Sequence, residues 1–226
     1  MATLAQLRFN ILNLKAGGKT SDDDWLAPAQ IDFIIAYSRS ILIRRDYQKR
    51  RFLDPNIEQD LGCVEMELVD NAECCNVQTG CLVLRSVLPI PNFVELQNSN
   101  LVSYVGTVDK THAFDLIPSA RARWINNNKY TAGLRRAFFI GAHLYIVNDK
   151  LLKYINVRGV FEDPAQAAKF NHCSGEPCFD PNTSEYPISF WMIGAITDMV
   201  LKGEVRETLV VPKDTENNAS GDATTR

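Results

Sequence analysis

Apolar residues recur at helical spacing near both ends of the 226-residue chain, and this pattern predicts three helices. Residues 3–15 place leucine and isoleucine on one face, and a longer pattern runs from about Pro28 to Arg51. The third pattern opens at Pro187, because proline is tolerated in the first turn of a helix. The longest pattern carries an apolar stripe of Ile31, Ile34, Ile35, Ser38, Ile41 and Leu42, widened by Phe33 and Tyr37.

Between these helical patterns the sequence is typical of β-strands and turns, with apolar and polar residues alternating most clearly after Leu61. Strands are predicted at residues 63–70, 81–91, 101–109, 137–140, 143–147 and 151–161. Gly141-Ala142 joins two of them, and glycine in first place favours a type II′ hairpin turn. Short helices are predicted at residues 118–124 and after Asp163-Pro164, where Asp163 is the expected cap.

The predicted fold class is α+β, with a helical bundle from the N- and C-terminal segments and a central antiparallel β-rich insertion. The bundle would comprise residues 1–56 and 163–211, and the insertion residues 57–162. Residues 212–226 contain no apolar residue beyond alanine after the opening proline, so we expect a flexible tail unless a partner holds it.

The composition is that of an ordinary globular protein, with 46% hydrophobic residues, 23% charged residues and a formal net charge of −3. This balance gives no bulk attraction to nucleic acid, although a local basic surface stays possible. The start of the chain lacks the pattern of a signal peptide, and no apolar run approaches the length of a membrane span. We therefore expect a protein that remains in a cytosolic compartment.

Six cysteines leave two interpretations open. In a cytosolic compartment we expect reduced thiols, either buried or in loops. The alternative is a zinc site, since thiolates and imidazole suit that metal. Its candidate ligands are Cys74, Cys75, Cys81, His172, Cys173 and Cys178. Neither cluster has the two-residue spacing of a zinc knuckle, which favours the first interpretation.

Two basic clusters are candidate contact surfaces. The first lies in the last turns of the long helix and comprises Arg44, Arg45, Lys49, Arg50 and Arg51. It is either a solvated helix end or a surface for DNA phosphates or an acidic partner. The second consists of Arg121 and Arg123 beside Trp124, a mixture that can also contact nucleic acid.

No catalytic signature occurs in the sequence. The patterns GxxxxGK[ST], GxGxxG, GxSxG and HExxH are absent, and nothing assembles a nucleophile, a base and an orienting group. We therefore expect neither an enzyme nor a cofactor. A zinc-dependent enzyme remains a minor alternative, tied to the zinc ligands above.

Six segments spread from about residue 29 to residue 220 resemble the neck or ring proteins of crAss-like and related Bacteroidetes tailed bacteriophages. They are QIDFIIAYSRSILIRRDYQKR, CLVLRSVLPIPNFVEL, SYVGTVDK, NVRGVFEDPAQAAKF, CFDPNTSEYPISFWMIGAITDMVLKGE and VPKDTENNAS. The resemblance implies a virion structural protein, one of the stacked rings that join the capsid portal to the tail. It also implies a twelvefold ring around the DNA channel, assembled with the portal and adjacent ring or tail proteins, whose terminal tail docks on a neighbour.

Ring assembly adds a physical expectation, because cyclic assemblies join different surfaces of neighbouring subunits. Large apolar side chains would supply such surfaces, and the candidates are Trp25, Phe33, Phe93 and Trp191, any of which could instead be buried in the core. The competing hypothesis is a small nucleic-acid-binding module that uses the two basic clusters.

Overall fold

A computed structural model describes residues 2–15, 27–70, 82–97, 99–127, 129–130 and 133–202. Several positions discussed above lie outside these residues: Trp25, Cys74, Cys75, Cys81 and the segment 212–226. The backbone of Arg123 is described but its side chain is not.

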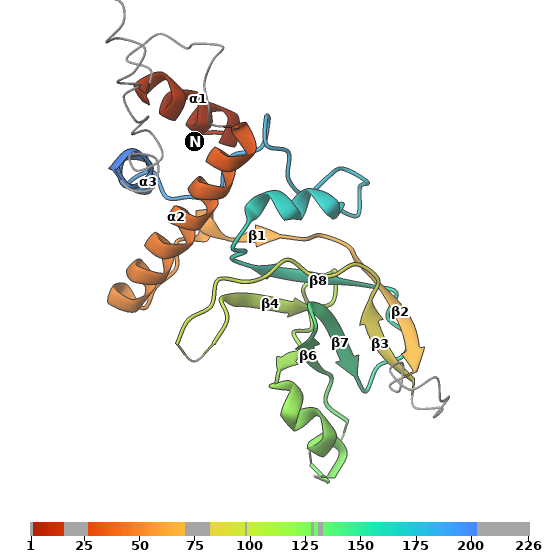
Figure 1. The fold of residues 1–226 in the computed structure, drawn as a ribbon. Coiled ribbons are helices and arrows are strands. Elements are labelled where there is room, and N and C mark those ends of the chain that lie inside the picture. Colours follow the sequence, from red (N-terminus) through yellow and green to blue (C-terminus); the bar gives the residue numbers. More distant parts are fainter. Residues whose placement is uncertain are drawn as a thin grey trace, which may run out of the picture.

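One curved sheet forms most of the molecule (Figure 1). Its strands are β1 (Gln59–Asp60), β2 (Val64–Asp70), β3 (Leu82–Ser86), β4 (Val102–Gly106), β5 (Asp115–Leu116), β6 (Arg136–Ile140), β7 (His143–Val147) and β8 (Tyr154–Gly159). The order is β1-β8-β2-β3-β7-β6-β5, and β4 also pairs with β8. Neighbouring strands are antiparallel except β5 and β6, which run parallel, so the sheet is mixed.

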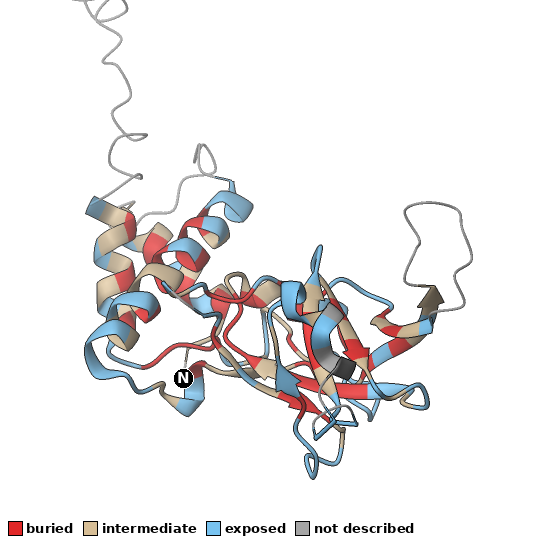
Figure 2. Ribbon diagram, turned by 90° about the horizontal axis from the view of Figure 1, so that it is seen from below, coloured by how far each residue is buried: buried red, intermediate tan, exposed pale blue. Residues whose placement is uncertain are grey.

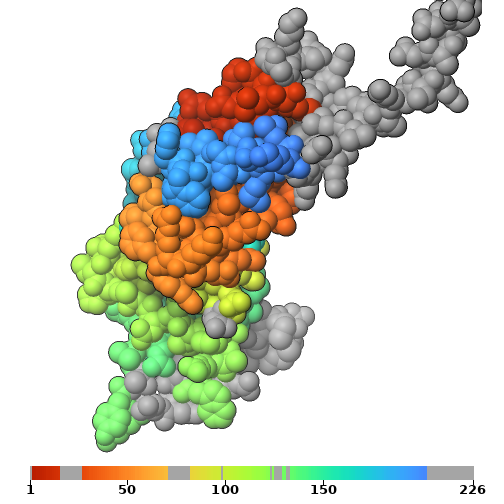
Figure 3. All heavy atoms as spheres, turned by 90° about the vertical axis from the view of Figure 1, so that its left-hand side faces the viewer, coloured from red at the N-terminus to blue at the C-terminus, as the bar shows by residue number. Residues whose placement is uncertain are grey.

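The three α-helices lie at one end of this sheet: α1 (Leu4–Lys15), α2 (Pro28–Arg50) and α3 (Met192–Lys202). The 3-10 helices η1 (Pro55–Ile57), η3 (Ser119–Asn127) and η4 (Pro164–Lys169) fall between α2 and α3 in the chain. Figure 3 shows α3 between α1 and α2, and all three contact one another.

The predicted fold class is wrong, because the protein is mostly β and the helices are not a bundle that carries a strand insertion. The reason is helix length. The helices α1 and α3 have 12 and 11 residues, and each contributes only three buried residues. Those two short faces and one side of α2 cannot form a separate helical core, so the helices pack onto the end of the sheet instead.

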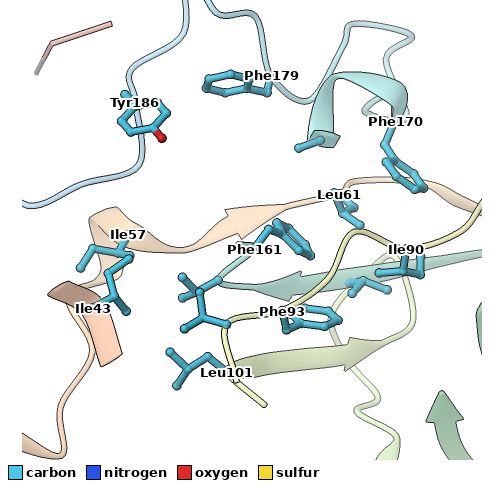
Figure 4. Packing of buried hydrophobic residues seen from close by; sticks show 14 of the residues in the cluster. Ile43, Ile57, Leu61, Ile90, Phe93, Leu101, Phe161, Phe170, Phe179 and Tyr186 are labelled. Carbon is cyan, nitrogen blue, oxygen red and sulfur yellow. The ribbon is translucent and has the colours of Figure 1, made fainter. Parts of the chain in front are cut away.

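The core is continuous from the helices into the sheet. Figure 2 shows buried positions in the α-helices and along the strands. Figure 4 shows Ile43 of α2, Ile57 of η1 and Phe161, which follows β8, within one group of buried side chains. The rings of Phe93 and Phe161 pack with centroids 4.9 Å apart. Helix end and sheet therefore share one apolar interior.

Two local predictions need correction. The third helix begins at Met192 and not at Pro187. The intervening residues make other bonds: the Pro187 carbonyl accepts from Arg39, and the Ser189 hydroxyl donates to Asp54 at 2.5 Å. The hairpin turn has φ of +55° at Gly141 and +67° at Ala142. Two positive φ angles belong to type I′, whereas type II′ requires only the first.

Candidate functional site

Helix α2 is fastened to the sheet by Arg39, whose side chain is completely buried. The guanidinium donates to the carbonyl oxygens of Phe161 (2.6 Å), Pro187 (2.8 Å) and Ile57 (3.3 Å). These carbonyls come from three separate parts of the chain: the end of β8, the segment before α3, and η1. A single side chain therefore holds the helical end and the sheet in one arrangement, since arginine offers five donors in a rigid fork.

Arg39 has no salt bridge within the described residues, and its charge is stabilised by carbonyl dipoles, by a ring and by the charge of Asp163. Its guanidinium carbon lies 5.9 Å from the centre of the Tyr186 ring. Burial lowers the pKa of Arg39 to about 10, because low-dielectric surroundings disfavour the charged form. At neutral pH the side chain remains charged. Arg39 is not among the functional residues predicted from the sequence.

A groove of about 680 Å³ runs beside α2. The exposed side of α2 and the residues of η4 and its cap form its walls, with Leu4, Asn92 and Tyr186 completing them. Phe33 and Tyr37 project from α2 into solvent here, with 68% and 52% of their surfaces exposed. Three carboxylates, Asp32, Glu162 and Asp163, and one guanidinium, Arg44, line the groove.

Two polar atoms on the groove walls lack hydrogen-bond partners among the described residues. They are Asp32 Oδ1 and the hydroxyl oxygen of Tyr186, and both are buried. The other carboxylate oxygen of Asp32 accepts from Arg8 at 3.0 Å. Burial raises the pKa of Asp32, and the charge of Arg8 opposes that shift. Burial also raises the pKa of Tyr186 and keeps its hydroxyl protonated at neutral pH.

The first basic cluster occupies the C-terminal end of α2, as predicted, and all five of its residues are exposed. Arg44, Arg45 and Lys49 carry no salt bridge within the described residues. Arg50 is engaged: it pairs with Asp46 at 3.1 Å and lies 5.7 Å from the centre of the Trp191 ring. Arg51 ends the helix in the left-handed region, with its backbone N–H donating to Tyr47.

The second basic cluster does not join the first. Arg121 belongs to η3, on the far side of the sheet from α2 (Figure 1), and its side chain is exposed. Among the described side chains, Arg121 is therefore separate from the basic cluster of α2.

The prediction of reduced cysteines changes for one pair. Cys63 and Cys173 form a disulfide, so the prediction that all cysteines are reduced is wrong for this pair. Their separation of 110 residues left no signal in the spacing. Within the described residues no group of three or more His, Cys, Asp or Glu side chains could hold a metal ion, and this includes His172 and Cys178. Burial raises the pKa of Cys178 to about 12, which disfavours the thiolate that a metal needs.

The aromatic candidates separate into two groups. Phe33 and Trp191 are exposed and remain available for contacts, whereas Phe93 is buried between Phe139 and Phe161. Further exposed aromatic side chains at the helical end are Phe9 and Phe190. None of the helices in the described ranges is both long and apolar enough to cross a bilayer.

Comparison with known proteins places these surfaces in context. The model of the family described as phage tail ring protein 2 matches residues 10–223. The chain is also similar to Ring protein 2 of Bacteroides phage crAss001, with 25% identity over 219 residues that cover 90% of this chain and 91% of that protein. The match extends through the helical end, the sheet and the segment after α3. The chain belongs to the phage tail ring protein 2 family.

Proposed function

We propose that the protein forms a closed ring, twelvefold in symmetry, that connects the portal to the tail and surrounds the DNA channel. Membership of a ring family and the resemblance of its segments to neck proteins support this proposal. The observation that carries it is the exposure of large aromatic side chains at the helical end. Phe9 of α1, Phe33 of α2 and Phe190 of the segment before α3 expose 60%, 68% and 80% of their surfaces.

Exposed aromatic side chains on several sides of one end suit a ring subunit. Each subunit of a ring joins its two neighbours through two different surfaces, so both surfaces need apolar contacts. Aromatic residues are also enriched at protein interfaces. The portal and the adjacent rings or tail proteins are the other proposed partners, with assembly in the host cytoplasm. The role is structural, and we propose no catalytic step.

Contact with DNA would be independent of base sequence. The exposed basic side chains Arg44, Arg45 and Arg121 can reach phosphates, which carry no base information. A strongly positive channel wall would slow DNA passage. We therefore assign the α2 cluster to a neighbouring subunit, and leave Arg121 and Arg123 as channel candidates.

The test is the mass and symmetry of the purified protein, alone and with its portal. Light scattering should give a discrete multiple of the 25.4 kDa chain, and averaged electron micrographs should show twelve subunits around a pore. Binding to a random duplex should be weak and should fall with salt. A protein that stays monomeric with the portal, yet binds duplex DNA tightly at low salt, would instead be a nucleic-acid-binding module.

A further inference from the structure

The groove beside α2 has the chemistry of a receptor for a cationic side chain. Phe33 and Tyr37 supply exposed aromatic faces, which attract ammonium and guanidinium groups. Glu162 and Asp163 supply carboxylates on the opposite wall. The groove walls therefore carry three carboxylates, of which Asp32 is paired with Arg8, and one guanidinium group, that of Arg44. Long aliphatic stems, as in lysine and arginine, can cover the apolar part of such a groove.

The buried polar atoms on the walls favour a guest with N–H donors. Tyr186 is 1% exposed, and within the described residues its hydroxyl has no hydrogen-bond partner. The Oδ1 atom of Asp32 is also buried and has no hydrogen-bond partner among the described residues. Leaving a buried polar atom unpaired is costly, and native structures pair most of them. Both oxygens can accept a hydrogen bond from an ammonium or a guanidinium group that enters the groove.

Two exposed cations at the end of α2, Arg45 and Lys49, cannot enter the groove of their own chain, whereas Arg44 lines it. Successive helical residues advance by roughly 100°, so Arg45 and Lys49 lie roughly 120° and 160° around the helix from Phe33. Lys49 is also about 24 Å further along the helix axis than Phe33. Arg45 and Lys49 carry no salt bridge in the described structure. The groove and these two cations are complementary in charge, but they can meet only when they belong to different molecules.

We propose that the groove receives the basic end of α2 from a second copy of this chain, with Lys49 and Arg45 as the entering side chains. This inference rests on the proposed ring and assigns one of its interfaces. The contact joins two different surfaces, so it leaves a free groove on one subunit and a free basic end on the other. Such a contact repeats until it closes. The Trp191 ring, held beside Arg50 at the basic end, adds apolar area to the same contact.

Charge reversal on each surface tests the contact separately. Glu162 has no hydrogen bond from its side chain in the described structure, and its backbone bonds survive substitution. We expect Glu162→Lys and Lys49→Glu each to weaken self-association by about tenfold or more, because like charges then face each other. The matched controls are Glu176→Lys and Lys150→Glu, which reverse exposed charges outside both surfaces and should assemble as the wild type does.

Mixing the two variants gives the decisive measurement. In an alternating ring, the reversed groove of Glu162→Lys meets the reversed basic end of Lys49→Glu. The two unchanged surfaces meet each other at the next contact. We therefore expect an equimolar mixture to regain assembly in sedimentation velocity, while each variant alone stays dissociated. The double variant Glu162→Lys/Lys49→Glu should assemble by itself.

The outcomes separate this inference from the proposed ring. A wild-type ring whose single variants also assemble overturns the groove contact and leaves the ring in place. Single variants that fail alone and also fail when mixed exclude pairing between these two surfaces. A wild-type chain that never self-associates, alone or with the portal, overturns the ring and the groove contact together.

Discussion

The substitution Arg39→Met removes the side chain that joins α2 to three backbone carbonyls while keeping a chain of similar length. The carbonyls of Phe161 and Pro187 then lose hydrogen bonds of 2.6 and 2.8 Å in a buried position, and Ile57 loses a longer one. Each buried acceptor left unpaired costs about 1–3 kcal/mol. Loss of the two short bonds should therefore lower the free energy of unfolding by about 2–6 kcal/mol.

Part of this loss is offset, because methionine does not carry a charge into the interior. The lowered pKa of Arg39, caused by burial, shows that the charged form is disfavoured there. We expect a net decrease of about 3 kcal/mol in the free energy of unfolding, a large share of the 5–15 kcal/mol typical of domains. The free energy of unfolding of Arg39→Lys should lie between those of the wild type and Arg39→Met, since an ammonium group reaches fewer of the carbonyls.

Urea unfolding followed by circular dichroism measures this difference on dilute protein. Arg121→Met is the matched control, because Arg121 is exposed, and it should change the free energy of unfolding by less than about 0.5 kcal/mol. An Arg39→Met protein as stable as the wild type would refute the reasoning. It would mean that burying the charge of Arg39 costs as much free energy as its hydrogen bonds contribute.

Three further predictions concern single features. Reduction, or Cys63→Ser/Cys173→Ser, should lower the free energy of unfolding by about 2–4 kcal/mol in thermal scans with and without dithiothreitol. Ala142→Gly should raise it by about 0.5–1 kcal/mol in urea unfolding, because alanine is strained at positive φ. Burial raises the pKa of Asp60, but hydrogen bonds, foremost from Lys110, lower it by more. The pKa of Asp60 is therefore below its usual value. This stabilisation is present above the unfolded pKa near 4 and disappears as pH falls through the folded value, so Asp60→Asn should flatten the acid limb of stability.

Local periodicity predicted the elements well, since it depends only on neighbouring residues. The alternation at residues 63–70 became β2, and the flanks of Gly141-Ala142 became the β6–β7 hairpin. Strands of two residues, such as β5, are too short to show a period. The fold class failed for a different reason. The fold class depends on whether helices or strands bury most of the apolar area. The periodicity of an amphipathic helix shows where its apolar face lies, but not how much of that face other elements cover.

The groove and its supports were harder to foresee. Arg39 lies four residues from Ile35 and from Ile43, so it occupies the buried line of α2, and a cation in that line was the available signal. The interpretation of α2 as an apolar half and a basic half concealed it. Tyr186 and Glu162 reach the groove from distant parts of the chain, and no spacing rule connects them with α2.

The position of Arg39 bears on assembly as well as on stability. Arg45 and Lys49 are turned away from the groove on α2, and the groove's far wall belongs to the segment around Glu162. In the proposed twelvefold ring, each contact must turn the next subunit by about 30°, and a wrong turn gives an open helix instead of a closed ring. The bonds from Arg39 to Phe161 and Pro187 fix α2 against that far wall. Arg39→Lys should therefore produce open or miscounted assemblies in electron micrographs at temperatures where the chain is still folded, whereas Arg121→Lys should give closed rings.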